Sequence, residues 1–161
     1  MATLTQDGRA GLAASVKARN IYLGIGSGAV SWDANGAPDE STSSSTLLSA
    51  VGYRLVTQKD FVVPATQGSI SLPSGRYNVS ATQTNRLYVR FTLDFEDAPG
   101  STIRETGIFL DPTPAAGLPV GQQFFTAAQM PNSGTLYLIE HIAPIIRTAA
   151  TRETFEFVLQ F

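Results

Sequence analysis

The chain has 161 residues, a length at which one domain can bury a core of its own. It contains no cysteine, which excludes disulfide bonds and thiolate metal sites. Only 15% of its residues are charged, the formal net charge is -2 and the arginines are scattered, so the clustered cations of a nucleic-acid-binding protein are missing.

The first predicted element is a short helix in an N-terminal helical segment, residues 1–20. Thr5 or Asp7 can cap its start, and Leu12, Ala13 and Val16 recur at helical spacing, so one face packs inward. No part of the chain has the ~20 consecutive apolar residues of a membrane span, and the start lacks the pattern of a secretory signal peptide. We therefore expect no membrane insertion.

Three glycines, Gly24, Gly26 and Gly28, lie in and directly after the strand-like run IYLGIG. A dinucleotide- or phosphate-binding loop needs a helix directly after its glycines, whereas the next segment contains a further glycine and a proline. We interpret the glycines as a turn in which glycine supplies positive φ. A long polar loop is predicted from there to the serine-rich run Ser41–Ser45.

The segment STLLSAVGYR predicts a second short helix. Ser45 or Thr46 can cap it, and its leucines and Val51 then face inward. The alternative is an irregular segment that ends at Gly52.

From Tyr53 onward the pattern is that of β-strands separated by Pro and Gly turns. The clearest strand is RLYVRFTLDFE, in which every second residue from Leu87 to Phe95 is apolar. Gly107 interrupts the strand TIRETGIFLD and marks a candidate bulge. The proline-rich stretch PTPAAGLPVG is predicted to be a loop. The other predicted strands are YRLVTQKDFVV, GSISL, YNVSATQ, QQFFTAAQM, GTLYLIEHIAPII and TRETFEFVLQF.

Short strands at a spacing of roughly 8–12 residues predict a mainly β fold. We expect an antiparallel β-sandwich with one or two short helices near the N-terminus. Since no repeat or linker divides the chain, the prediction is a single β-sandwich domain over residues 1–161.

Residues suited to catalysis or metal binding are few. His141 is the only histidine, and Glu140 beside it points to the opposite face of a strand, so the two cannot hold one ion together. Asp94 and Glu96 share a strand face, as a glycosidase pair would, but nothing nearby suggests a raised pKa. The other carboxylate groupings are Asp39 with Glu40, Asp97 beside Glu96, and Glu153 with Glu156. We expect no catalytic, metal-binding or cofactor-binding residue and no enzyme activity.

Glu105 is the most informative charge, because it lies inside TIRETGIF, a strand that we otherwise expect to be half-buried. A buried carboxylate must be paired or hydrogen-bonded. Arg54, which follows TLLSAVGY, is the candidate partner, so we predict a structural ion pair between Arg54 and Glu105. The alternative is that Glu105 faces water.

Several short motifs occur in a fixed order along the chain. IYLGIGSG is followed by TLLSAVGYR, then by an E-x-G-hydrophobic-Phe/Tyr strand in RETGIFLD, and then by GLPVGQQFFTA and ETFEFVLQF. The strand motif places Glu105, Gly107, Ile108 and Phe109 in matching positions. In these features the chain resembles bacteriophage tail proteins of the tail-fibre, collar and baseplate class.

The resemblance implies a structural virion component, a baseplate or tail-fibre connector that acts by self-association and by docking other tail proteins. Its partners would be further copies of itself in a symmetric homo-oligomer and other phage tail proteins, without nucleic acid or cofactor. Its place would be the virion tail, assembled in the host cytoplasm. The candidate contact elements are the N-terminal helix and the loops Ser41–Ser45 and Pro112–Pro119.

A second interpretation is a carbohydrate- or receptor-binding module at the tail tip. Such a module needs an exposed aromatic platform, for which Trp32, Tyr53, Tyr77 and Tyr88 are the candidates. The same rings are equally compatible with a core or an interface.

Overall fold

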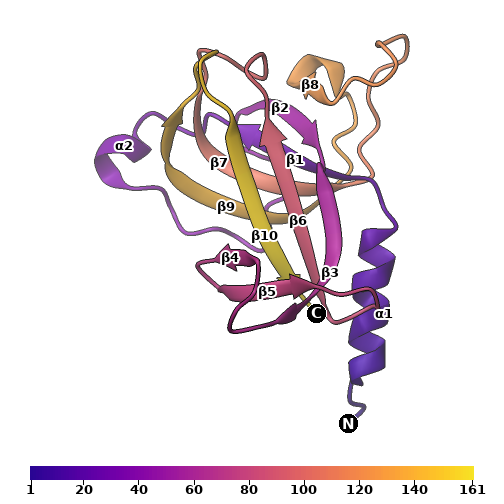
Figure 1. Ribbon diagram of the computed structural model, residues 1–161. Coiled ribbons are helices and arrows are strands. Elements are labelled where there is room, and N and C mark those ends of the chain that lie inside the picture. Colours follow the sequence, from indigo (N-terminus) through magenta and orange to yellow (C-terminus); the bar gives the residue numbers. More distant parts are fainter. The chain divides into compact units, whose positions relative to one another are not determined.

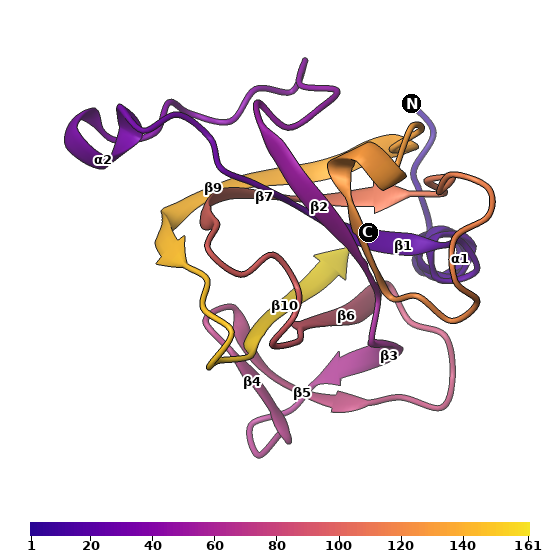
Figure 2. The same ribbon diagram turned by 90° about the horizontal axis from the view of Figure 1, so that it is seen from above.

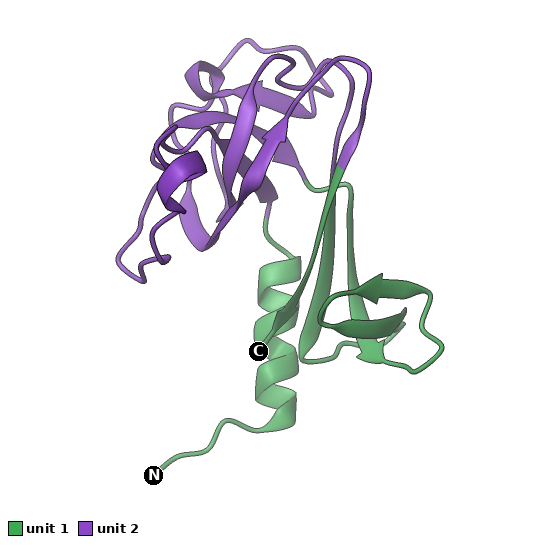
Figure 3. Ribbon diagram, turned by 90° about the vertical axis from the view of Figure 1, so that its left-hand side faces the viewer, with its two compact units in different colours: residues 1–19, 56–91, 154–161 green, residues 20–55, 92–153 purple.

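The computed structural model describes residues 1–161, and its contacts divide the chain into two compact units (Figure 3). Unit 1 comprises residues 1–19, 56–91 and 154–161, and unit 2 comprises residues 20–55 and 92–153. Each unit is built on one five-stranded antiparallel sheet. The predicted mainly β, antiparallel fold with short helices near the N-terminus is confirmed, whereas the organisation as one domain stays a prediction.

The sheet of unit 2 has the order β8-β2-β1-β7-β9, and β2, β1, β7 and β9 are seen side by side in Figure 2. Its central strands β1 and β7 are buried along almost their whole length, and β7 buries charged and polar side chains as well as apolar ones. The bounds are β1 (Ile21–Gly26), β2 (Ala50–Leu55), β7 (Thr102–Leu110), β8 (Phe124–Thr126) and β9 (Thr135–Ile146), with the 3₁₀-helix η1 (Ala127–Gln129) after β8.

An apolar cluster covers one face of this sheet. Residues directly opposite each other in antiparallel strands share a face, and the rings of Tyr53 and Phe109 meet edge-on there with centroids 5.3 Å apart. Leu47 belongs to the cluster although it precedes β2, so the segment before β2 covers part of this face of the sheet. The buried members are Tyr22, Leu47, Tyr53, Phe109, Phe125 and Met130.

The glycine run has a different role from the predicted turn. Gly24 and Gly26 lie within β1, and only Gly28 has a positive φ, +55°. A Cβ at Gly24 would lie 2.5 Å from the ring of Phe109 on the neighbouring strand. The turn interpretation is therefore wrong for two of the three glycines, because glycine is needed in β1 to admit bulky side chains from β7.

The predicted second helix does not form. Residues 45–49 are irregular and β2 begins at Ala50, so Val51 and Gly52 belong to a strand. The N–H groups of Leu48 and Ser49 donate to the carboxylate of Glu105, and so make no helical hydrogen bonds. A one-turn helix, α2 (Trp32–Asn35), forms instead within the predicted polar loop.

The predicted bulge at Gly107 is displaced. Gly107 pairs regularly with Gly24 on one side and with Ile139 on the other. The register of β7 with β9 shifts on either side of it, between Ile103 and Glu105 and between Ile108 and Phe109. Gly107 serves packing, since a Cβ there would lie 2.8 Å from the side chain of Leu136.

The sheet of unit 1 has the order β10-β6-β3-β5-β4. The alternation predicted for β6 is confirmed, because every second residue from Leu87 to Leu93 is fully buried. The strand ends at Leu93, however, so Phe95 lies in the following turn and is 42% exposed. The bounds are β3 (Gln58–Pro64), β4 (Ile70–Leu72), β5 (Gly75–Val79), β6 (Arg86–Leu93) and β10 (Glu153–Gln160).

Helix α1 (Gln6–Lys17) belongs to unit 1 (Figure 1), and of the two predicted caps, Thr5 and Asp7, it uses Thr5. The N–H of Gly8 donates to Oγ1 of Thr5 at 3.1 Å, which caps the helix. The ammonium group of Lys17 lies 4.4 Å from the centre of the Phe61 ring on β3 and 4.0 Å from the carboxylate of Asp60. The buried face of the helix consists of Ala10, Ala13 and Val16.

Candidate functional site

Unit 2 holds every buried polar or charged residue of the protein, namely Asp97, Arg104, Glu105, Thr106 and Arg147. Burial of a charge is costly unless it is paired or hydrogen-bonded. The partners of these side chains therefore indicate where the fold fixes surface segments in place.

Glu105 anchors the segment that precedes β2. Its side chain is only 1% exposed, and its two carboxylate oxygens accept the N–H groups of Leu48 at 3.1 Å and Ser49 at 2.9 Å. These bonds satisfy two main-chain donors that no regular element serves. The buried charge thus fixes the path of residues 45–49 over the apolar face of the sheet.

The structure gives Arg54 and Glu105 separate partners in place of the predicted ion pair. Arg54 lies opposite Leu23, whereas Glu105 lies opposite Gly26, so β1 separates them. Leu23 and Gly26 are three residues apart on one strand and point to opposite faces of the sheet. Arg54 therefore pairs elsewhere, with Asp97 at 2.7 Å.

Three arginines hold the turn that follows β6. Nη1 of Arg54 donates to Asp97, and Nη2 of Arg147 donates to the carbonyl oxygen of Asp94 at 2.7 Å. Nε of Arg152 lies 2.6 Å from the carboxylate of Asp94, and its guanidinium covers the Phe95 ring at 4.8 Å. The predicted strand pair of Asp94 and Glu96 is therefore a turn in which Asp94 is engaged by arginines.

A second cluster joins α2 to β7. The guanidinium of Arg104 binds both carboxylate oxygens of Asp33, at 2.7 and 2.6 Å, and donates to the carbonyl oxygen of Ser27 at 3.1 Å. This bidentate hydrogen bond lowers the pKa of Asp33 and raises that of Arg104. The ion pair fixes the one-turn helix against the sheet.

The same loop also binds the edge strand β9 at His141. The Trp32 ring lies 4.7 Å from the His141 ring, and Nδ1 of His141 is 2.7 Å from the carbonyl oxygen of Pro38. The carboxylate of Glu40 accepts the backbone N–H of His141 at 2.8 Å, and this bond lowers the pKa of Glu40. Sequence reasoning missed this cluster, because its two halves lie about a hundred residues apart.

The other residues considered from the sequence, namely Glu140, His141 and the tyrosines of the aromatic platform, do not come together in one site. Glu140 and His141 pair with neighbouring residues of β7 and so point to opposite faces, as expected. Across the whole chain no group of three or more His, Asp or Glu side chains is placed to hold a metal ion. No helix has the length and apolar character of a membrane span. Of the proposed aromatic platform, Tyr53, Tyr77 and Tyr88 are buried.

Unit 1 contains a buried tyrosine with a charged partner. Tyr88 is 2% exposed, and its hydroxyl donates to the carboxylate of Glu156 on β10. Burial, followed by the bond to Glu156, raises the pKa of Tyr88 to about 12. Tyr88 packs with Val62 and Tyr77 in a small buried apolar cluster on one face of the unit 1 sheet.

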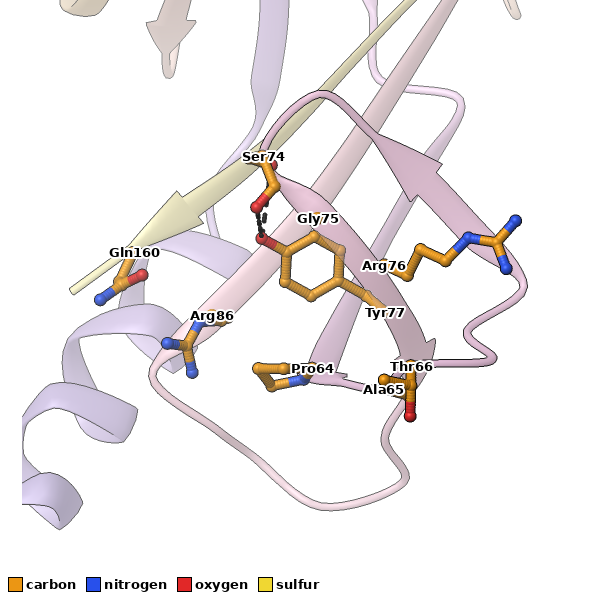
Figure 4. Close-up of a pocket in the computed structure, with 9 residues that line it drawn as sticks. All are labelled: Pro64, Ala65, Thr66, Ser74, Gly75, Arg76, Tyr77, Arg86 and Gln160. Carbon is orange, nitrogen blue, oxygen red and sulfur yellow. Dashed lines mark hydrogen bonds between the residues drawn. The ribbon is translucent and has the colours of Figure 1, made fainter.

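An open pocket of about 540 Å³ lies beside β5 in the same unit (Figure 4). The hydroxyl of Tyr77 is 3.3 Å from both the carbonyl and the hydroxyl oxygen of Ser74. Arg76 and Arg86 extend on opposite sides of the Tyr77 ring and do not meet. The pocket therefore lacks the converging polar groups of a catalytic centre.

One comparison decides the identity of the chain. A family model described as "Baseplate wedge 3 tail fiber network component" matches residues 1–161, the whole sequence. The chain belongs to this family. A search of curated proteins found no match.

A baseplate wedge 3 tail fibre network component is a structural part of the virion tail. The predicted resemblance to phage baseplate and tail-fibre proteins is thereby confirmed. The clusters around Glu105, Arg104 and the 94–97 turn fit such a structural role, because they fix loops in place.

Proposed function

We propose that this baseplate component is a connector that associates with itself and docks other tail proteins in the virion tail, after assembly in the host cytoplasm. Membership of a tail fibre network family carries the proposal, because a network component must contact neighbouring proteins. The proposal assigns the protein no reaction.

The surface supports a docking role. Only 15% of the residues are charged, and several large apolar side chains reach solvent. Leu4 and Leu12 lie at the start and on the outer side of the α1 segment, and Val120 follows directly after the loop Pro112–Pro119. These exposed apolar side chains are available for contact with a partner protein.

Helix α1 is the element we assign to other tail proteins. Deleting residues 1–19 would be an ambiguous test, because Ala13 and Val16 are buried and Lys17 contacts β3. Leu12→Glu places a charge on the exposed side and leaves the buried face intact. Gln83→Glu adds the same charge at an exposed position of unit 1 and serves as the control.

The experiment is co-expression with the other baseplate proteins of the same virion, followed by size-exclusion chromatography with light scattering. We expect a mass above the 17.1 kDa of one chain and co-elution with at least one tail protein. Leu12→Glu should lower that co-elution at least tenfold, and Gln83→Glu should not. A protein that stays monomeric and co-elutes with no tail protein would refute the proposal.

A further inference from the structure

The two sheets end in four edge strands, of which three are protected against pairing. Strands β4 and β8 have three residues each. Strand β9 contains Pro144, shifts register twice against β7, and has the N–H of His141 bound by Glu40. Short length, proline, bulges and a covering loop are among the means by which proteins keep edges from pairing.

Strand β10 has none of these features. Its sequence ETFEFVLQ contains no Pro, Gly or Lys, and it forms the outer side of its sheet next to β6 (Figure 1). Aromatic and β-branched residues of this kind favour strand pairing. An eight-residue regular strand that ends a sheet is a template for another strand.

The direction of the backbone groups of β10 follows from one hydrogen bond. The N–H of Phe161 donates to the carbonyl oxygen of Asn85 at 3.0 Å, which continues the ladder with β6. Because backbone groups alternate in direction along a strand, those of Glu156, Val158 and Gln160 point away from β6. No other segment of the chain forms a backbone hydrogen bond with these three residues.

We propose that this outer edge pairs with the β10 edge of a second copy of the chain, antiparallel and about a two-fold axis at Val158. The inference rests on the self-association part of the proposed function and specifies its surface. Residues 156–160 then exchange about six backbone hydrogen bonds between the two copies, two for each directly opposed pair. A two-fold axis needs a surface that is complementary to itself, and β10 has this property.

The side chains support this register. With Val158 opposite Val158, Glu156 lies opposite Gln160 of the second copy, so an amide can donate to each carboxylate. Phe157 then lies opposite Leu159, and Phe155 opposite Phe161, which are favourable cross-strand pairs. A register centred on Glu156 would place the two carboxylates directly opposite each other, which is destabilising.

The first test uses the outward N–H of Val158. Val158→Pro removes a donor that β6 does not use, and proline is tolerated at such edge positions. Val158→Thr keeps the N–H and the branched shape and is the matched control. In sedimentation equilibrium we expect a dimer for the wild type and for Val158→Thr, and at least a tenfold weaker dimer for Val158→Pro. Circular dichroism establishes that each variant is folded.

The second test uses charge at an exposed position and avoids any question of folding. Gln160→Glu places like charges opposite each other twice per dimer, and Gln160→Lys places opposite charges there. We expect the first to weaken and the second to strengthen the dimer, by about fivefold each. Equal dissociation constants for the two variants would overturn the proposed register.

The outcomes separate this inference from the function on which it rests. A wild-type dimer that responds neither to Val158→Pro nor to the charge at position 160 keeps self-association and overturns the β10 edge. A wild-type chain that is monomeric at every concentration overturns the β10 edge together with the self-association part of the proposed function, and co-elution then tests the docking part alone. If the dimer forms but does not co-elute with other tail proteins, the docking role of α1 is rejected and the β10 pairing is retained.

Discussion

Gly26 lies directly opposite Glu105 across β1 and β7, and a Cβ at Gly26 would lie 2.4 Å from Oε1 of that buried carboxylate. The glycine therefore makes room for the charge, and the charge in turn binds the N–H groups of Leu48 and Ser49. The contact between β1, β7 and the segment before β2 therefore requires a residue without a Cβ at position 26.

Gly26→Ala should lower the free energy of unfolding by about 3 kcal/mol, because the new Cβ displaces Glu105 from its two main-chain donors. Urea unfolding measures the effect. Gly11→Ala is the control: nothing lies within 4 Å of a Cβ there, and alanine in helix α1 should stabilise the protein by up to about 1 kcal/mol. Equal stability of Gly26→Ala and the wild type would contradict this account of the glycine.

Arg147 should matter far more than Arg152, although both contact the 94–97 turn. The Arg147 side chain is fully buried and donates to the carbonyl oxygens of Asp94 and Thr151. Arg147→Met leaves these carbonyls without donors, so we expect a loss of about 3 kcal/mol in the free energy of unfolding. Arg152 is 59% exposed, and Arg152→Met should cost less than about 1 kcal/mol. Thermal unfolding compares the two, and similar melting temperatures would count against the assignment.

The contact between Trp32 and His141 should be lost in acid. Hydrogen bonding to Arg104 lowers the pKa of Asp33, so the stabilisation from this pair is present above the ordinary carboxyl pKa. It is lost as the pH falls through the lowered value, below about pH 4. Since Trp32 is the only tryptophan, its fluorescence reports the change. Asp33→Asn should show the acid signal already at pH 7, whereas Asp39→Asn should titrate like the wild type.

Tyr88 should make the protein sensitive to alkali. Its pKa is raised to about 12, so the stabilisation of its neutral form is complete below pH 10 and disappears as the pH rises through 12. Between these values the free energy of unfolding should fall by up to about 3 kcal/mol more in the wild type than in Tyr88→Phe. Because burial is the larger cause, Glu156→Gln should remove only part of this difference. Urea unfolding at pH 9 and pH 11.5 tests both variants.

Local patterns in the sequence predict much of the secondary structure. Alternation predicts β6 and β10, because a strand that buries one face must place apolar residues at every second position. Thr5 before an alanine-rich run predicts the start of α1. These elements depend on neighbours within a few residues, and such neighbours can be read directly from the sequence.

The candidate site depends on longer distances and was predicted only in part. Glu105 is buried and hydrogen-bonded, as its apolar surroundings indicated, but its partners are main-chain N–H groups, which no sequence letter records. The partners of Arg54 lie in a turn some forty residues further on. A distant contact also explains why the predicted second helix is absent. The carboxylate of Glu105 accepts the N–H groups of Leu48 and Ser49, which a helix would have used for its own hydrogen bonds.

Strand β1 has a consequence for synthesis of the protein. Ile21 pairs with Leu110, so one side of this buried, apolar strand stays open until the ribosome has made β7. At ordinary elongation rates this interval is on the order of ten seconds. During that time the nascent chain exposes an unpaired apolar strand edge, the kind of surface that chaperones protect from aggregation.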